Sequence, residues 1–238
     1  MSADSNESFD RYAEEYDSAL SQGLAVSGEN KDYFAHRRIE WLRTHLPRDM
    51  TGLNRVMDYG CGTGSSAPLL LDILGAKALI GTDTSAKSLA IAARDHNSQN
   101  FQFLNFDEYR PDGELDLVYS NGVFHHIPLS DRAGAVGYIY RAIRPGGLFA
   151  LWENNPWNPG TRLVMSRIPF DRDAITLTAR NARDLLRCGG FEILRTDFLF
   201  IFPNFLRGLR GIEPYCAGLP LGAQYQVLCR KPVPSSEN

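Results

Sequence analysis

The chain has 238 residues, of which 43% are hydrophobic and 22% are charged, and its formal net charge is -3. This length suits one α/β domain with a sizeable core and is short for two independent domains. The composition is ordinary for a globular protein, and the charge speaks against nucleic-acid binding by general charge neutralisation.

The amino terminus and the cysteines indicate the compartment. The first ten residues, MSADSNESFD, are acidic and polar, and no run approaches the roughly 18 apolar residues of a membrane span. The cysteines form no CxxC pair and stand at no zinc-ligand spacing with histidines. We therefore expect reduced thiols, no metal site and a soluble protein of the cytoplasm. The four cysteines are Cys61, Cys188, Cys216 and Cys229.

In the first half of the chain, short apolar runs alternate with amphipathic stretches, which is typical of β-α units. Pro68 is compatible with a helix only because it falls in the first turn. Strands are expected over residues 55–59, 78–82, 101–104 and 115–120. One helix is expected from the glycine turn after the first strand to about residue 74, and another over residues 86–96.

In the second half, apolar residues recur three or four apart from Leu129 to Ile143, which predicts one face of a helix. The following Arg-Pro-Gly-Gly should end that helix. Thr178 is the expected cap of a helix ending at Cys188. The remaining strands are expected over residues 148–152, 191–201 and 224–230.

Three segments lie outside this alternation. Residues 7–46 indicate two helices, residues 155–175 follow the fifth strand, and residues 202–222 interrupt the last hairpin and are too long for a plain turn. All three can cover the carboxyl ends of the strands, where open α/β sheets bind ligands. We expect substrate recognition to lie in them.

Polar and glycine residues follow three successive strands. The loop from Gly60 to Gly64 can bring the backbone close to a ligand, because glycine tolerates positive φ. Asp83 closes the second strand near the ~20-residue offset at which a carboxylate meets a ribose diol. After the third strand, Asp107 can accept from an adenine amino group and Phe106 can contact the purine ring. These positions predict a site for an adenosine-containing cofactor.

The spacing of the glycines distinguishes between such cofactors. Dinucleotide binders use G-x-G-x-x-G, whereas this loop has G-x-G-x-G with Ser65 at the position of the third glycine. Asp58 stands two residues before the first glycine. S-adenosylmethionine (SAM) has no phosphate but carries a methionine ammonium, which a nearby carboxylate can hold. The pattern therefore favours SAM.

Four motifs in this order resemble those of class I SAM-dependent methyltransferases, and more narrowly the methyltransferase type 11 group. They are 58–64 (DYGCGTG), 81–83 (GTD), 105–107 (NFD) and 117–121 (LVYSN). The resemblance covers residues 9–151 and implies a Rossmann-like, mostly parallel seven-stranded sheet between helices, of order 3-2-1-4-5-7-6 with the last strand antiparallel. We expect one domain over 1–238: a helical cap (1–50), a cofactor-binding core (51–154) and carboxyl-terminal strands with substrate-covering insertions (155–238).

The resemblance also implies cofactor contacts. The loop with Gly60, Cys61, Gly62 and Gly64 would bracket the methionine part of SAM, beside Asp58. Asp83 and Thr84 would lie at the ribose, Phe106 and Asp107 at the adenine, and Asn121 near the cofactor. Tyr12 belongs to an amino-terminal stretch resembling a helix that closes over the cofactor. An amphipathic helix that simply packs its apolar face is an equal alternative.

For the acceptor side, the sequence offers two histidines and a carboxylate at neighbouring strand ends. His125 and His126 follow the fourth strand and Glu153 ends the fifth, so an imidazole–carboxylate pair can act as a general base on a hydroxyl. The alternative is that the histidines only shape the pocket. The Asn121-Gly-Val-Phe stretch departs from the Asp/Asn-Pro-Pro-Tyr of enzymes that methylate nucleobase or amide nitrogens. Methyl transfer to oxygen of a small molecule is therefore favoured.

Other functions stay open at this point. Aromatic residues over 198–205 suggest an apolar acceptor, and residues 219–225 vaguely resemble methyltransferases of sugar or lipid modification. A basic rim of Arg37, Arg38, Arg207 and Arg210 would suit a tRNA or protein methyltransferase. An NAD-linked oxidoreductase on the same sheet and a non-catalytic SAM-binding module are further alternatives. The sequence leaves the oligomeric state undetermined.

Overall fold

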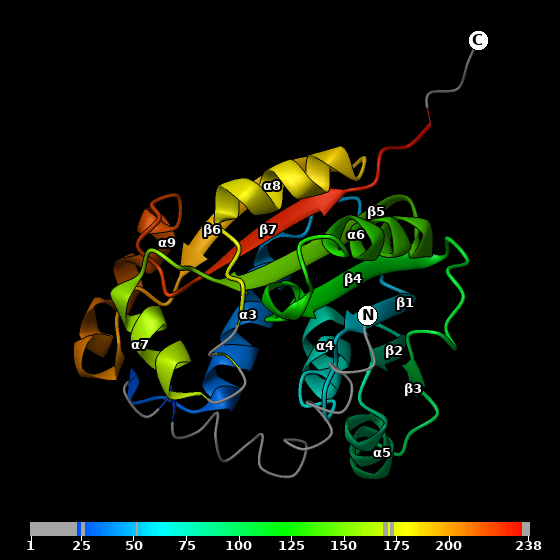
Figure 1. The fold of residues 1–238 in the computed structure, drawn as a ribbon, viewed down its shortest axis with the longest axis horizontal. Helices are drawn as coiled ribbons and strands as arrows, with labels where there is room; N and C mark the ends of the chain where they lie inside the picture. Colours follow the sequence, from blue (N-terminus) through cyan, green and yellow to red (C-terminus); the bar gives the residue numbers. More distant parts are fainter. Residues whose placement is uncertain (1–22, 25–26, 51, 169–170, 172–173, 235–238) are drawn as a thin grey trace.

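The computed structural model describes residues 23–24, 27–50, 52–168, 171 and 174–234. Its centre is a seven-stranded sheet with the order β3-β2-β1-β4-β5-β7-β6 (Figure 1). The strands are β1 (Arg55–Tyr59), β2 (Ala78–Asp83), β3 (Phe101–Asn105), β4 (Leu115–Asn121), β5 (Ile143–Asn154), β6 (Glu192–Leu199) and β7 (Gln224–Arg230). Strands β1 to β5 pair in parallel, and β7 runs antiparallel between β5 and β6. The predicted order and the antiparallel last strand are confirmed.

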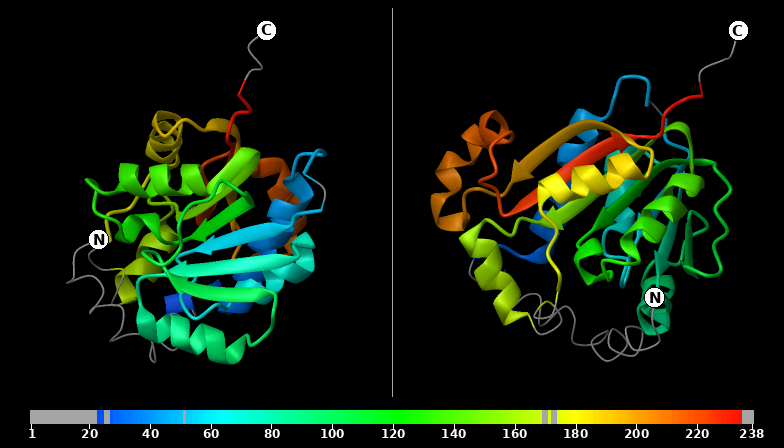
Figure 2. Two further views of the ribbon diagram at one scale, coloured as in Figure 1. Left: turned by 90° about the vertical axis from the view of Figure 1, so that its right-hand side faces the viewer. Right: turned by 45° about the horizontal axis from the view of Figure 1, so that its top comes forward.

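Helices cover both faces of this sheet (Figures 1 and 2). The α-helices with fully described bounds are α3 (Lys31–His45), α4 (Ala67–Leu74), α5 (Ala86–Asp95), α6 (Arg132–Ala142), α7 (Pro159–Arg167), α8 (Ala179–Cys188) and α9 (Glu213–Cys216). There are also two 3-10 segments, η2 (Phe124–His126) and η4 (Asn204–Ile212). As predicted, the Thr178 side chain caps α8 by accepting from Asn181 N at 3.2 Å.

The core has two layers because side chains alternate across each strand. On β1, Val56 belongs to the cluster that packs under α3 and α4, and Met57 belongs to the cluster that packs under α6 and α8. Both side chains are fully buried. Covering both faces makes the central strands almost continuously apolar, as expected for a parallel sheet. Polar groups on these strands are therefore concentrated at their carboxyl ends.

The boundary between α6 and β5 differs from the expectation. The helix ends at Ala142, and β5 begins at once with Ile143, which pairs with Leu115 on β4. A register shift follows at Leu117, and the Pro-Gly-Gly stretch is carried within the strand. The chain can do this because Gly146 takes φ of +78°. The Gly146 N–H donates to Lys231 O at 2.8 Å, which extends the pairing beyond the expected start of the strand.

The three segments outside the β-α alternation gather near one edge of the sheet. Helix α3 packs against α4 on one face, whereas α7 and the η4–α9 segment lie beyond the ends of β5 and β6 (Figures 1 and 2). The first of the two expected amino-terminal helices falls outside the described residues. In the part of the chain that the structure describes, no helix combines the length and apolar character that crossing a bilayer requires.

Candidate functional site

The glycine loop after β1 is a tight turn held against β2. The N–H groups of Gly60 and Cys61 both donate to Thr82 O, at 2.8 and 3.0 Å. Gly60 has φ of +78°, and a Cβ at this position would stand 2.3 Å from Cγ2 of Val123. Neither the backbone conformation nor the space admits a side chain there. The loop thus presents bare backbone at the edge of the sheet.

Asp83 ties this loop to the end of β2. One carboxylate oxygen accepts from Gly62 N and the other from Ser85 N, both at 2.9 Å. The Ser85 side chain in turn caps α5 by accepting from Ser88 N at 3.1 Å. The carboxylate therefore fixes the loop and the start of α5 together, and it lies at the wall of a pocket.

This pocket, of about 100 Å³, lies where the cofactor is expected. Six of the predicted cofactor residues line it: Gly60, Gly62, Asp83, Thr84, Phe106 and Asn121. Phe106 packs its ring against Tyr59 with the centroids 4.5 Å apart. The side-chain oxygen of Asn121 is buried and accepts no hydrogen bond from the described residues. A buried acceptor without a donor fits a ligand that brings one, such as an ammonium group.

The other predicted cofactor residues lie beside this pocket or beyond the described chain. Gly64 packs against α5, because a Cβ there would stand 2.9 Å from His96. Cys61 is buried, with its Sγ donating to Gly62 O at 3.6 Å. Asp107 is exposed at the end of β3, where its N–H donates to Asn105 Oδ1 at 3.2 Å. Tyr12 lies outside the described residues.

Asp58 is a buried carboxyl between the sheet and α3, with 3% of its surface exposed. Burial and the nearby charge of Asp83 raise the pKa of Asp58 to about 7, against the attraction of Arg38. With this pKa, the carboxyl is about half-ionised near neutral pH. A cation placed beside it would shift it to the charged form.

A second, larger cavity of about 440 Å³ adjoins the first, and Asn121, Gly122 and His126 line both. Its walls come from the segments that the sequence analysis assigned to substrate recognition, α7 and η4, together with α3. Apolar side chains such as Met165, Phe200 and Phe202 form much of the lining. Its volume lies in the range of small-molecule sites.

Basic side chains also face this larger cavity. Arg38 is buried and donates to Tyr119 Oη at 3.2 Å and to Gln224 Oε1 at 2.9 Å. Arg210 donates to Glu29 Oε1 at 2.8 Å and lies over the ring of Tyr33, with the guanidinium carbon 4.8 Å from its centroid. Of the basic rim expected for RNA, Arg38 and Arg210 are thus turned into the cavity wall.

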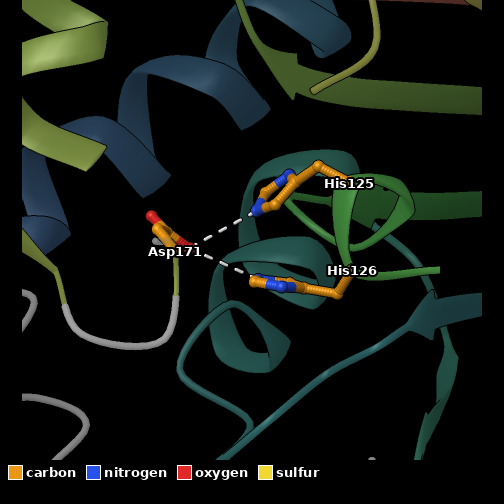
Figure 3. A group of neighbouring side chains, drawn as sticks. All are labelled: His125, His126 and Asp171. Carbon is orange, nitrogen blue, oxygen red and sulfur yellow. Dashed lines mark ion pairs between the residues drawn. The ribbon is translucent and has the colours of Figure 1, made fainter. Parts of the chain in front are cut away.

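The two histidines lie where both cavities meet. His125 is 3% exposed, and its Nδ1 lies 2.6 Å from Glu153 Oε2. The other oxygen of Glu153 accepts from Phe124 N at 2.7 Å. On the far side, Asp171 brings Oδ1 to 3.5 Å from His125 Nε2 and 3.4 Å from His126 Nε2 (Figure 3). The structure thus brings the predicted His125 and Glu153 into direct contact.

The charges in this cluster shift several pKa values. Burial disfavours the charged imidazole, but Glu153 and Asp171 raise the pKa of His125 to about 10. Burial and the charge of His125 lower the pKa of His126, although Asp171 opposes this. Burial would raise the pKa of Asp171, but the two neighbouring imidazoles lower it. The two neighbouring histidines therefore differ in protonation.

Sequence reasoning missed Asp171 and the inward direction of Arg38 and Arg210. Asp171 stands in a segment without periodicity, far along the chain from the histidines it approaches. The pattern Arg37-Arg38 at the surface of a helix gave no sign that Arg38 is buried. Of the expected aromatic entrance, Phe200, Phe202 and Phe205 line the larger cavity, whereas Trp152 is buried in the core and Trp157 is largely exposed.

The parallel sheet, the glycine turn after β1 and the acidic end of β2 define a Rossmann-like protein with the class I methyltransferase topology. The family described as "Methyltransferase domain" matches residues 57–151. A solved SAM-dependent methyltransferase from Thermotoga maritima superimposes with a TM-score of 0.66 and 22% identity, covering 95% of this chain and 99% of that one.

Similar sequences belong to the same class of enzyme. A "Probable S-adenosylmethionine-dependent methyltransferase" of Mycolicibacterium smegmatis is 29% identical over 219 residues, covering 88% of this chain and 80% of that protein. The trans-aconitate 2-methyltransferase of Methylobacterium nodulans is 27% identical over 197 residues, covering 74% of this chain and 75% of that enzyme. The chain spans about half the length of other trans-aconitate 2-methyltransferases that it matches. The chain is a class I SAM-dependent methyltransferase, and SAM is its cofactor.

Proposed function

We propose that the enzyme transfers the methyl group of SAM to an oxygen atom of a small organic acid that enters the 440 Å³ cavity. The observation that carries this proposal is the contact of that cavity with the cofactor pocket at Asn121, Gly122 and His126. A methyl donor bound on one side of these residues and an acceptor bound on the other would lie close to each other. Such alignment is the main requirement of the reaction.

The cofactor residues have distinct tasks in this proposal. Asp83 and Thr84 hold the ribose, Phe106 contacts the adenine, and the oxygen of Asn121 with the carboxylate of Asp58 attracts the methionine ammonium. SAM supplies a methyl group on a sulfonium, which is already electrophilic. The protein therefore needs only to orient the acceptor, exclude water and, for a hydroxyl, remove a proton.

The lining of the larger cavity favours an acid with an apolar part. Arg38 and Arg210 bring positive charge to walls that are otherwise rich in phenylalanine and aliphatic side chains. A guanidinium recognises a carboxylate through paired hydrogen bonds. The similarity to trans-aconitate 2-methyltransferases supports a small acidic acceptor. Phe205, which is 81% exposed, extends the apolar wall outward and suits an acceptor with a longer apolar tail.

The need for a base depends on the acceptor atom. A carboxylate oxygen is a nucleophile at neutral pH and requires no proton removal. A hydroxyl requires a base, and His126, which lines both cavities, is then the candidate, with His125 and Glu153 as positioning groups. The base role of His125, His126 and Glu153 stays a prediction.

Free thiols favour the cytoplasm as the location of this reaction. All four cysteines are free, and Cys61 and Cys229 are buried where no disulfide partner reaches them. Oxidising compartments usually convert such residues to disulfides. A sugar- or lipid-linked acceptor, a tRNA or a protein stays an alternative that the acceptor screen distinguishes.

A screen with SAM carrying a labelled methyl group tests the proposal. We expect transfer to members of a panel of small mono-, di- and tricarboxylic acids, with the label in an ester that mild alkali releases. Hydroxylated aromatics, sugars, total tRNA and protein extract form the comparison arms. Label that enters only tRNA or protein, or that resists alkali in every product, would contradict the proposal.

A further inference from the structure

The group formed by His125, His126 and Asp171 has the arrangement of a metal site. One oxygen, Asp171 Oδ1, lies 3.5 Å from His125 Nε2 and 3.4 Å from His126 Nε2 (Figure 3). The three candidate ligand atoms all lie within 4.8 Å of one another. Tetrahedral zinc binds imidazole nitrogen and carboxylate oxygen at about 2.0–2.2 Å, which sets neighbouring ligand atoms about 3.3–3.5 Å apart. The two separations between imidazole nitrogen and carboxylate oxygen match these edges.

The distances are too long for the alternative, a proton shared between imidazole and carboxylate. A charge-assisted N–H···O bond in a buried site is about 2.7–2.9 Å long. The Nε2 of His125 is buried and makes no hydrogen bond to the described residues; its contact with Asp171 Oδ1 is an ion pair at 3.5 Å. At this distance the desolvation of the nitrogen is only loosely compensated, and a cation bound between the two groups would satisfy both.

The surroundings of His125 fix the nitrogen that would face a metal. Glu153 Oε2 lies 2.6 Å from Nδ1, so Nδ1 would keep its proton in a metal-bound form. A cation that displaces the other imidazole proton would then meet the lone pair of Nε2, on the side of Asp171. The second Glu153 oxygen accepts from Phe124 N and cannot turn away without losing that bond. A carboxylate behind a ligating imidazole is the usual outer-shell partner at zinc sites, where it sets the tautomer and strengthens the ligand.

We infer that His125, His126 and Asp171 bind a divalent cation of the zinc class, with Glu153 as the outer-shell partner of His125. Two imidazoles and one carboxylate supply three protein ligands. All three residues line the 440 Å³ cavity, so the fourth position opens toward the acceptor. There the cation would hold an acceptor oxygen, a role that rests on the proposed function, whereas binding of the cation does not. With the cation bound, His126 is a ligand and does not serve as the base. The sequence analysis expected no metal site, because Asp171 shows no spacing relation to the histidines.

Metal binding to the full chain, made without a histidine tag and stripped with a chelator, tests the inference. Titration calorimetry with zinc chloride should give one site per chain, and Co²⁺ should give the visible absorption of a four-coordinate ion. Asp171→Asn should abolish both signals. Glu153→Gln, which removes only the outer-shell carboxylate, should weaken zinc binding about 10–100-fold.

The matched control is His36→Gln. His36 and Glu40 form an exposed pair on α3 with Nδ1 and Oε2 3.4 Å apart, the same donor types without burial. This variant should bind zinc as the unaltered chain does. Absence of one-to-one binding in the unaltered chain, or its loss in His36→Gln, would overturn the inference. If Asp171→Asn does not fold by circular dichroism, His126→Gln replaces it. SAM affinity, measured separately, reports the methyltransferase assignment independently.

Discussion

Asp83 illustrates how one side chain connects the fold with the proposed cofactor pocket. Its carboxylate satisfies Gly62 N and Ser85 N, two donors that the turn and the start of α5 would otherwise leave open. The same group lies at the wall of the cofactor pocket. Its removal should therefore affect the shape of the loop and the affinity for the ribose together.

Asp83→Asn should weaken SAM binding by about 10–100-fold, because hydrogen bonds to a charged group contribute about 1.5–3 kcal/mol. Calorimetric titration with SAM measures the effect. Asp95→Asn, at the exposed end of α5 where Asp95 pairs with Arg94, is the control and should leave the affinity unchanged. Equal affinities in both variants would exclude a ribose contact at Asp83.

Asp58 predicts a dependence of stability on pH. The pKa of this carboxyl is raised to about 7 in the folded chain from its ordinary value of 3.8, so the folded state retains a proton that the unfolded state releases. The free energy of unfolding should therefore fall as pH rises from about 4 to about 7, with no further change from this group above that range. Asp58→Asn should lose this dependence, as denaturant titrations at pH 5 and pH 8 would show.

SAM affinity should change with pH in the opposite direction. The methionine ammonium attracts the ionised form of Asp58, which at pH 6 is only about a tenth of the total. The dissociation constant for SAM should therefore fall about tenfold between pH 6 and pH 8. In Asp58→Asn the affinity for SAM should be lower than in the unaltered enzyme and should not change with pH over this range. A flat profile in the unaltered enzyme would show that Asp58 does not face the ammonium.

At the scale of an element, the turn between β1 and α4 allows two effects of an added side chain to be measured separately: strain in the backbone and steric overlap with neighbouring atoms. Gly60 and Gly62 both have positive φ, but a Cβ at Gly60 meets Val123 at 2.3 Å, whereas none of the described atoms lies within 4 Å of a Cβ at Gly62. The second position therefore isolates backbone strain, and the first adds a steric overlap with the segment after β4.

Gly62→Ala should lower the free energy of unfolding by about 1–2 kcal/mol, the cost of left-handed backbone in a residue with a Cβ. Gly60→Ala should cost more, by a further amount of about 1–3 kcal/mol for the forced displacement of Val123. Urea denaturation of both variants measures the difference. Equal losses would mean that the segment around Val123 moves aside freely.

At the scale of the whole molecule, the proposed donor and acceptor sites are formed mostly by different parts of the chain. The proposed cofactor pocket belongs to the segments after β1, β2, β3 and β4, and the larger cavity mainly to α3, α7 and η4, with Asn121, Gly122 and His126 shared. A substitution in the larger cavity should therefore alter methyl transfer without altering SAM binding.

Met165→Trp tests this separation. Met165 is buried on the cavity side of α7, so a larger side chain there should reduce kcat/KM for the acceptor about tenfold, as expected from 1–3 kcal/mol of overpacking. The dissociation constant for SAM should stay within twofold. Leu163→Trp, on the exposed side of the same helix, should change neither quantity. Equal losses in both variants would indicate damage to α7 rather than a filled cavity.

The sequence by itself determined the strands of the sheet and, through the family resemblance, their order, and it predicted the edge for the cofactor. The strands and the predicted edge follow from local information: apolar periods, glycine turns and acidic residues at strand ends. The expected cofactor residues on the wall, from Gly60 to Asn121, come from consecutive β-α units whose carboxyl ends must meet at one edge. Where β5 begins was misjudged, because pairing with β4 and β7 outweighed the turn propensity of Pro-Gly-Gly.

Only the tertiary structure decided how the acceptor side is assembled. Asp171 meets His125 and His126 through packing of a segment without periodic pattern, and Arg38 turns inward because Tyr119 and Gln224 supply its partners. Such contacts join residues far apart in the chain, and their formation depends on burial and on which partners happen to lie across the cavity. A local sequence pattern records neither the burial of a side chain nor its partners across the cavity, because the same side chain would be exposed to solvent in another tertiary arrangement.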